Sequence, residues 1–316
     1  MKERLVGWLC CPDCRGDLVL EQATRNEFGI ESGRLRCREC DHDYPIIKSI
    51  PRFVKTDAYV GNFSFEWTVH KKTQLDSVSG NTESRDSFSE KTGTEPASLQ
   101  GKMVLEAGCG MGRYLEIAQP YAQEVVGVDL SFAVDSAFGN LKKYENVHIV
   151  QADIFKLPFK PGIFDLIYSL GVLHHTPSTE QAFLMLPPLL KKNGIVAIWV
   201  YSNDSTYLQV WNAFTNFYRI FTVHIPEKLL WYLCHVAIPF YYVKKIPLLG
   251  PVLNIIFPMS NHPDAESRVL DTFDWYSPKY QYKHTYKEVL GWFSSAGLEN
   301  IIRLPFPVSV KGEKKK

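Results

Sequence analysis

The stretch from Val104 to Arg113 constrains the fold more than any other part of this chain. An apolar run breaks there into a turn that carries three glycines at alternate positions, Gly108, Gly110 and Gly112. Glycine adopts positive φ freely and has no side chain, so such a turn lets the backbone approach a ligand closely. A second apolar run ends on Asp129. An acidic residue at the end of the second strand of a β-α-β unit is typical of a site for a nucleotide ribose. The pattern predicts an α/β fold with a nucleotide-type ligand.

Further apolar runs follow in a recognisable order. Runs at 147–150 and 164–170 precede Leu173-His174-His175-Thr176, and after a helical stretch another run occupies 189–198. In this order, residues 101–203 resemble the class I S-adenosylmethionine (SAM)-dependent methyltransferases. The resemblance implies a Rossmann-like, seven-stranded methyltransferase sheet with helices on both faces, and SAM as the cofactor.

The same resemblance assigns residues to the cofactor. The three glycines would bring the backbone against the methionine end and the ribose of SAM, and Glu106 would lie near its amino group. Asp129 would accept hydrogen bonds from both ribose hydroxyls. Asp153 would bind the adenine amine, with a turn or N-cap role as the alternative. The other predicted cofactor contacts are Leu130, Ala152, Ile154, Ser169 and Leu170.

His174 and His175 follow the predicted fourth strand, where the pocket of an open α/β sheet is found. The ordinary pKa of histidine, about 6.5, suits a base at neutral pH. We therefore name both as candidate catalytic residues. The alternative is that one of them packs or holds a loop.

Two Cys-x-x-Cys pairs lie near the start of the chain, Cys11 with Cys14 and Cys37 with Cys40. This spacing predicts a closed four-sulfur zinc site, which is structural because it leaves no position for water. The residues that follow, 44–53, resemble a small zinc-ribbon-like family found fused to methyltransferases or partnering them. We expect residues 1–56 to form this domain, either as a stability cap or as a module that helps to orient a substrate.

The net charge and the start of the chain exclude few functions. The 316 residues carry a formal net charge of +1, which gives no general attraction to nucleic acid. The start of the chain lacks the long apolar region of a secretory signal. We therefore expect a cytoplasmic protein whose cysteines are thiols or metal ligands. The sequence does not predict an oligomeric state.

Two segments beside the core contain many aromatic residues. Residues 57–100 are polar but include Phe63, Phe65, Trp67 and Phe88, and they resemble the N-terminal cap of small-molecule methyltransferases. Residues 204–262 form an insertion whose aromatic residues recur partly at helical spacing. It lacks a run of about 20 apolar residues that could span a membrane. It could be a helical subdomain with its own core, a lid over an apolar pocket, or a contact with a membrane surface.

Residues 263–316 would complete the methyltransferase core with a last helix and a strand hairpin. Asp274, Trp275, Tyr276 and His284 occupy positions where the family often contacts its acceptor. The charged tail, 311–316, reads as a solvated charge run.

These readings predict a SAM-dependent methyltransferase with a small acceptor, apolar or linked to a lipid or sugar, methylated at oxygen or nitrogen. Nucleic acid is expected to be an unlikely partner, given the neutral charge and the arginine-poor insertion. Methylation of an rRNA or tRNA base is the alternative. A further alternative is a non-catalytic SAM-binding partner protein.

Overall fold

A seven-stranded sheet forms the centre of the computed structural model, which describes residues 1–56, 59–69, 72 and 74–315. The strands are β5 (Met103–Ala107), β6 (Glu124–Asp129), β7 (Val147–Gln151), β8 (Phe164–Leu170), β9 (Leu190–Trp199), β10 (Leu298–Arg303) and β11 (Ser309–Lys314). Their order is β7-β6-β5-β8-β9-β11-β10, and β11 runs antiparallel to both of its neighbours. The predicted seven-stranded, Rossmann-like sheet is confirmed.

Helices cover both faces of this sheet because alternate strand residues point to opposite sides. Val104 packs in one core cluster with residues of α3 (Glu83–Thr92), α4 (Arg113–Ala118) and α5 (Ala133–Leu141). Its neighbour Leu105 packs in a second cluster with residues of α6 (Thr179–Leu184) and α12 (Tyr286–Ser295). On that side the rings of Phe183 and Phe293 stack at a centroid distance of 4.5 Å.

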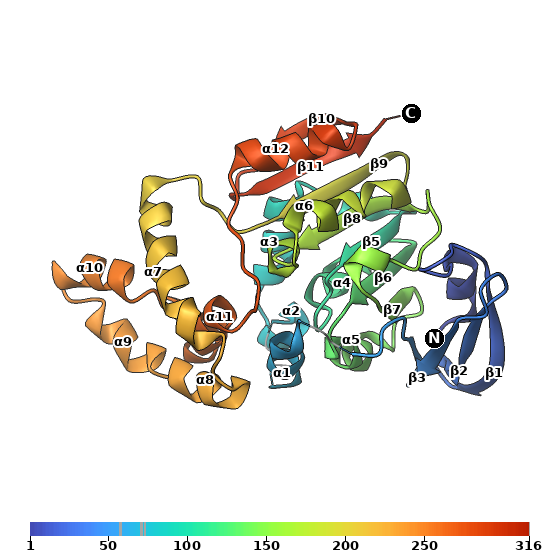
Figure 1. Ribbon diagram of the computed structural model, residues 1–316, viewed down its shortest axis with the longest axis horizontal. Helices are drawn as coiled ribbons and strands as arrows, with labels where there is room; N and C mark the ends of the chain where they lie inside the picture. The colour runs from blue at the N-terminus through green and yellow to red at the C-terminus, as the bar shows by residue number, and fades with distance from the viewer. Residues whose placement is uncertain (57–58, 70–71, 73, 316) are drawn as a thin grey trace.

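The N-terminal domain is a separate four-stranded antiparallel sheet beside β7 (Figure 1). It contains the short helix η1 (Glu3–Trp8) and strands β1 (Leu18–Asn26), β2 (Gly29–Cys37), β3 (Asp43–Ile47) and β4 (Ile50–Pro51). Just after β4, Arg52 bridges Gln151 in parallel, and the Phe53 N–H donates to the Gln151 carbonyl at 2.8 Å. The chain therefore runs along the edge strand of the large sheet on leaving the small one.

The segment before β5 begins over the carboxyl ends of the strands, packs α3 on one face of the sheet and then reaches the amino end of β5. It contains α1 (Gly61–Val69), α2 (Asp76–Ser79), α3 and η2 (Pro96–Leu99). Phe88, one of the predicted aromatic anchors, is fully buried against Tyr168 at a ring distance of 5.2 Å. The side chains of Phe65 and Trp67 lie outside the described part of the structure. Ser64 Oγ accepts a hydrogen bond from the Phe132 N–H at 3.0 Å, which ties α1 to the loop after β6.

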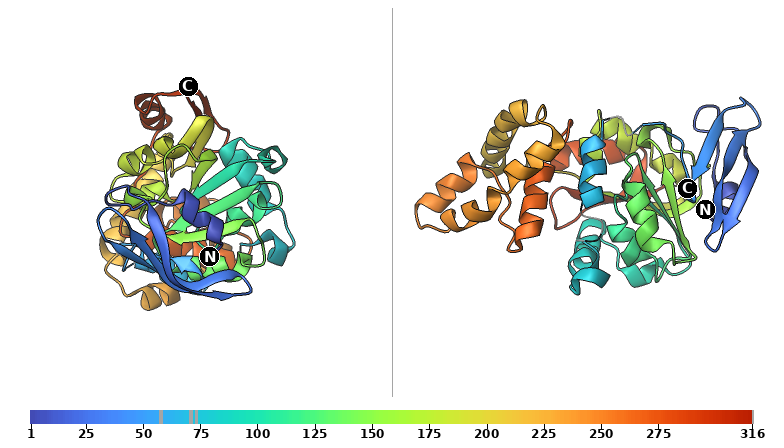
Figure 2. Two further views of the ribbon diagram at one scale, coloured as in Figure 1. Left: turned by 90° about the vertical axis from the view of Figure 1, so that its right-hand side faces the viewer. Right: turned by 90° about the horizontal axis from the view of Figure 1, so that it is seen from below.

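The insertion at 204–262 is helical. It contains α7 (Thr206–Thr222), α8 (Glu227–Cys234), α9 (Ala237–Val243) and α10 (Leu249–Ile256), and it packs on α11 (Ala265–Tyr276). A small core joins Leu230 and Cys234 of α8 to Val269, Phe273 and Tyr276 of α11. The subdomain lies at the opposite end of the molecule from the N-terminal sheet (Figure 2). Within the described ranges, no helix combines the length and the apolar character needed to cross a membrane.

The end of the chain is ordered into the sheet, contrary to the predicted solvated charge run at 311–316. Residues up to Lys314 belong to β11, and Lys314 Nζ donates to the Leu190 carbonyl at 2.7 Å. Gly312 lies so close to Phe293 that an added Cβ would come within 2.7 Å of its ring. The buried residues of this strand are Ser309, Val310 and Gly312, so its charged residues follow a short buried start that the charge pattern does not reveal.

Arg52 is the one buried cation at the junction between the two sheets among the residues that the structure describes. It is 8 % exposed and donates to Gln151 Oε1 at 2.7 Å and to Asp135 Oδ1 at 2.9 Å. We expect Arg52→Ala to lower the free energy of unfolding by about 2 kcal/mol, because the buried Gln151 amide loses a charged partner. Urea unfolding measures this change.

Arg34→Ala is the matched control, because the side chains of Arg34 and Asp43 are 43% and 41% exposed in their ion pair. Such a pair contributes less than about 1 kcal/mol. Equal losses in the two variants would contradict the structural role given to Arg52.

Candidate functional site

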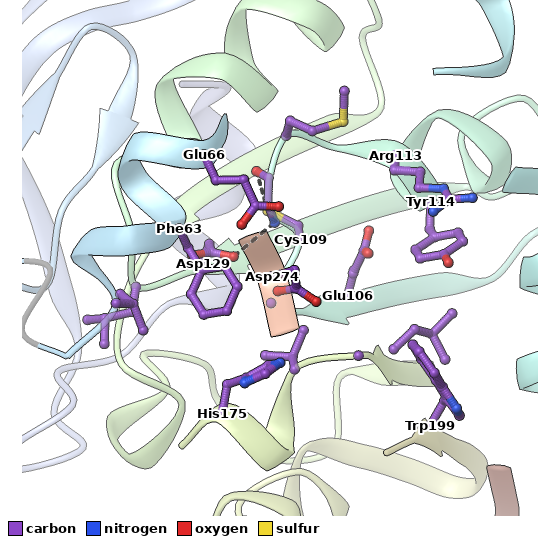
Figure 3. Close-up of a pocket in the computed structure, with 18 of the residues that line it drawn as sticks. Phe63, Glu66, Glu106, Cys109, Arg113, Tyr114, Asp129, His175, Trp199 and Asp274 are labelled. Atoms are coloured by element: carbon purple, nitrogen blue, oxygen red, sulfur yellow. Dashed lines mark hydrogen bonds between the residues drawn. The ribbon is translucent and has the colours of Figure 1, made fainter. Parts of the chain in front are cut away.

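A cavity of about 530 Å³ opens at the carboxyl ends of the central strands, where α1 and α11 close over the sheet (Figure 3). Its wall combines residues from the glycine turn, from the ends of β6, β7, β8 and β9, and from the two covering helices. This volume lies in the range of sites that enclose a small-molecule ligand. It is also where ligands bind in open α/β sheets.

The glycine turn forms the floor of this cavity. Gly108 has φ +86°, and a Cβ at this position would come within 2.3 Å of the Val172 side chain. Gly112 has φ +92° and precedes α4, with the Leu141 side chain 2.7 Å from a hypothetical Cβ. Both conformations are readily open only to glycine. The turn therefore presents bare backbone to the cavity beside Gly108 and Gly110.

Asp129 holds this turn in place from the neighbouring strand. Its Oδ2 accepts the Gly110 N–H at 2.9 Å, and its Oδ1 accepts the Ser131 N–H at 2.8 Å and the Ser131 hydroxyl at 2.6 Å. Burial raises the pKa of the Asp129 carboxyl, and these donors act in the opposite direction. The carboxylate lines the cavity together with Leu130, Ala152 and Ile154.

Glu106 lies at the end of β5, inside the cavity wall. It is 2 % exposed, and it accepts the Tyr168 hydroxyl at 3.3 Å. Burial raises the pKa of Glu106 well above its ordinary value. A cationic group of a ligand in this position would favour the charged carboxylate.

Some predicted cofactor residues lie outside the cavity wall. Asp153 is the N-cap of a short 3-10 helix, η3 (Ile154–Lys156), and accepts the Phe155 N–H at 3.0 Å. Ser169 is fully buried and donates to the Ala107 carbonyl at 2.7 Å. Gly112 lies at the end of the turn, next to α4, and does not line the cavity. Leu170, in contrast, lines the cavity. The cofactor roles of these residues stay predictions, but for Asp153 the geometry agrees with the capping alternative.

The structure separates the two histidines. His175 lines the cavity, and its Nδ1 lies 2.9 Å from the Tyr280 carbonyl, so Nδ1 carries the proton. Nε2 is buried without a hydrogen-bond partner, and burial lowers the pKa of His175 to about 3. His174 is fully buried behind it, against the Tyr201 ring at 3.9 Å, with neither ring nitrogen bonded.

The part of the cavity facing α11 is acidic and aromatic. Asp274 and Trp275, two of the four residues named as candidate acceptor contacts, line it, whereas Tyr276 donates to the Pro258 carbonyl at 2.5 Å and His284 bonds Thr179 at 2.9 Å. The aromatic side chains in the wall are Tyr59, Phe63, Tyr114, Trp199, Tyr201, Trp275 and Phe306.

Sequence reasoning missed Glu66, Lys91 and Asp271, which also line the cavity. Lys91 is 8 % exposed, and its Nζ lies 3.7 Å from the centre of the Trp199 ring. Glu66 had one usable signal, because it is the acidic residue within the aromatic run 63–67. Nothing in the sequence indicates that this run meets α11 across the cavity.

The four predicted metal ligands converge at one end of the N-terminal sheet. The sulfur atoms of Cys11, Cys14, Cys37 and Cys40 all lie within 4.8 Å of one another, at 3.6 Å for Cys11 to Cys40 and 3.3 Å for Cys14 to Cys37. Four sulfurs around a tetrahedral zinc ion lie about 3.8 Å apart. The donor set therefore fits structural zinc. Cys10 turns toward the core instead, where its N–H donates to the Pro158 carbonyl at 2.9 Å.

Comparison with known proteins identifies the two parts. Residues 105–198 match the family model of the methyltransferase domain, and residues 2–49 match that of the Trm112p-like proteins. The prediction of a class I, SAM-dependent methyltransferase domain behind a zinc-ribbon-type domain is confirmed.

Curated relatives match about a third of the chain. Malonyl-[acyl-carrier protein] O-methyltransferase of Legionella pneumophila is 32% identical over 108 residues, 33% of this chain and 38% of that protein. The tRNA U34 carboxymethyltransferase of Pseudoalteromonas translucida is 35% identical over 100 residues, 30% of this chain and 31% of that protein. The tRNA (carboxymethyluridine(34)-5-O)-methyltransferase alkbh8 of Xenopus tropicalis is 29% identical over 121 residues, 37% of this chain and 18% of that protein.

The matched stretch thus spans less than two fifths of each of these relatives. Among solved structures, the complex between the Haloferax volcanii Trm112 methyltransferase activator and a methyltransferase is similar at a TM-score of 0.47. It shows 12% identity and covers 81% of this chain and 98% of that one.

Two predictions need correction. Relatives named for tRNA, from bacteria and from a frog, contradict the predicted lipid- or sugar-linked small acceptor and the expectation that nucleic acid is an unlikely partner. The geometry explains the error, since the aromatic residues of 204–262 suggested an apolar pocket. Among the described residues, however, the cavity wall includes none from that segment. The net charge is also a sum over the whole chain and does not report on a local surface.

The metal site gives a direct test. We expect about one zinc ion per chain, and Cys37→Ser should abolish it and lower the melting temperature by several degrees, because the small sheet loses its central cross-link. Elemental analysis and thermal unfolding measure both effects.

Cys10→Ala is the matched control, because Cys10 adjoins a ligand but faces the core. It should keep the full zinc content. Loss of zinc in Cys10→Ala with retention in Cys11→Ala would show that the wrong cysteine has been assigned.

Proposed function

We propose that this chain is a SAM-dependent methyltransferase that methylates a base in RNA, with tRNA as the first candidate. The observation that carries the proposal is the composition of the cavity. One side offers a glycine turn and two carboxylates for the cofactor, and the other offers aromatic rings and buried acids for a flat, polar acceptor.

The cofactor side fits SAM residue by residue. Gly108 and Gly110 line the cavity and would face the ligand with backbone, and Asp129 would accept the ribose hydroxyls. Glu106 would face the amino group, and Ala152 and Ile154 would pack on the adenine ring. Bound SAM supplies an electrophilic methyl group on a sulfonium. The chain's own contribution is to hold the acceptor atom on the axis of that methyl group.

The acceptor side suits a nucleobase taken out of its stack. Enzymes that modify a base hold it between aromatic or apolar side chains and read its edge with hydrogen bonds. Phe63 and Tyr201 supply rings close to His175, at 5.2 Å and 5.5 Å, and Trp275 lines the same wall. Unpaired bases of RNA loops are recognised by such stacking. The names of the tRNA-modifying relatives support the same choice.

The N-terminal domain would act by supporting the core and not by contacting the ligand. Its residues are absent from the described cavity wall, so the ribbon is a support for the core. Arg52 contacts Gln151, whose amide donates to the Leu130 carbonyl at 3.0 Å. Leu130 lines the cavity beside Asp129. Structural zinc in the ribbon would thus stabilise the loop that receives the cofactor.

Asp129 and Asp153 offer a paired test of the cofactor site. We expect Asp129→Asn to weaken SAM binding by about tenfold or more, because it removes the charge from hydrogen bonds to the ligand. Asp153→Asn keeps an N-cap residue and should leave the affinity close to that of the wild type. Isothermal titration calorimetry measures both.

Unchanged affinity in Asp129→Asn would contradict this cofactor assignment. A comparable loss in Asp153→Asn would instead show that Asp153 binds the adenine amine.

Transfer of a labelled methyl group tests the acceptor class. We expect protein, labelled SAM and total tRNA to give label that ribonuclease releases, and Asp129→Asn to reduce the yield strongly. Host lipid and small-molecule extracts are the parallel samples. Label confined to those extracts, with SAM binding intact, would rule out RNA as the acceptor.

A further inference from the structure

Three acidic side chains, one buried and two half-buried, meet at the cavity from two elements that are far apart in the sequence. Glu66 comes from α1, and Asp271 and Asp274 come from α11. Glu66 is 2 % exposed, and its Oε2 has no hydrogen-bond partner. The side chains of Glu66 and Asp274 lie around the same hollow as Asp129 and His175 (Figure 3). A buried carboxyl oxygen without a partner beside a cavity indicates a ligand that donates a hydrogen bond to it.

The surroundings of these acids hold little compensating charge. Asp274 Oδ2 accepts the Tyr201 hydroxyl at 2.6 Å, and Asp271 Oδ2 accepts the Ser260 hydroxyl at 2.8 Å. Arg219 is the cation that acts on Asp274, and it donates to the carbonyls of Trp275 and Pro278 at 3.1 Å and 2.6 Å.

Lys91 and Arg113 are the cationic side chains that line the described part of the cavity wall, and both are engaged elsewhere. Lys91 faces the Trp199 ring, and Arg113 bonds Ser84 at 2.8 Å and pairs with Glu83 at 3.6 Å. A ligand with a carboxylate would therefore meet like charge beside Glu66 and Asp274. A ligand with N–H groups would satisfy them.

We propose that Glu66 and Asp274 bind a nucleobase nitrogen that carries hydrogen, and that Asp274 takes its proton during methyl transfer. The inference rests on the proposed function and names the reacting atom. As the nitrogen–carbon bond forms, the carbon–sulfur bond of the cofactor breaks and its electron pair stays on sulfur. The nitrogen's N–H electron pair stays on nitrogen, and the proton passes to the Asp274 carboxylate.

Asp274 suits this role better than His175 does. Burial raises the pKa of Asp274 to about 6, while the Tyr201 hydrogen bond and Arg219 act to lower it. A base with a pKa near the working pH is the most effective one. Burial lowers the pKa of His175 to about 3, which makes its imidazole a poor proton acceptor. Burial and the nearby acids raise the pKa of Glu66 well above its ordinary value.

The pH profile of tRNA methylation tests the role of Asp274. Wild-type kcat/KM should fall as the pH drops through about 6, because protonated Asp274 cannot accept a proton. Asp274→Asn should lower kcat at least about a hundredfold and abolish this fall at low pH (the acid limb of the profile), with SAM affinity unchanged. Glu66→Gln should raise KM for tRNA more than it lowers kcat.

Tyr201→Phe keeps the proposal testable if Asp274→Asn fails to fold. Loss of the hydroxyl should raise the pKa of Asp274, which moves the acid limb to higher pH. Glu266→Gln, on the exposed part of α11, is the control and should match the wild type. An acid limb at the same pH in Tyr201→Phe, or wild-type kcat in a folded Asp274→Asn, would overturn the role of Asp274.

The methylated nucleoside identifies the reacting atom. Labelled tRNA is digested to nucleosides and analysed by chromatography with mass spectrometry. Methyl on a base nitrogen supports the inference. Methyl on a carbon, on a ribose or on a carboxyl group of a modified uridine overturns it and leaves the proposed function intact. Absence of label from RNA overturns the proposed function itself.

Discussion

The contact between Asp129 and the backbone of the glycine turn is the interaction on which the rest of the site depends. It joins the ends of two neighbouring parallel strands, since Gly110 follows β5 and Asp129 ends β6. A glycine turn is entropically costly to order, and one carboxylate with three donors, one of them in the turn, fixes it. The same carboxylate keeps its place in the cavity wall. The residue that organises the floor is therefore also the one that would receive the ribose.

The sequence predicted the core well because its signals are local. Strand, turn and acidic residue lie within 26 positions between Val104 and Asp129, and each has a backbone reason to be there. The cysteine pairs are equally local, and the two-residue spacing to Cys14 already selects Cys11 over the neighbouring Cys10. Asp153 shows the limit of such reasoning, because a carboxylate after a strand can bind a ligand or cap a turn, and only the geometry distinguishes the two.

The acceptor side was harder to predict because it is assembled from distant segments. Glu66, Tyr201 and Asp274 are separated by more than a hundred and by more than seventy positions, and their meeting depends on how α1 and α11 pack. Aromatic content misled in the same way. The rings of 204–262 form part of a separate helical group, while the rings at the cavity come from 59–63, from α4, from 199–201, from α11 and from Phe306. The amino-acid composition gives the number of aromatic side chains in the chain but not the surfaces or cavities that they face.

The fusion of the ribbon to the core has a consequence for how the protein is made. Arg52 and its partner Gln151 are 99 positions apart, so the ribosome releases the small sheet well before the strand on which it rests. At ordinary rates of synthesis this interval is about 5–20 s. During that time the N-terminal sheet has no β7 to pack against, and its own four thiolates would have to stabilise its fold. With zinc in the ribbon as proposed, the supply of metal at the ribosome would be a condition for this folding step, before any cofactor site exists.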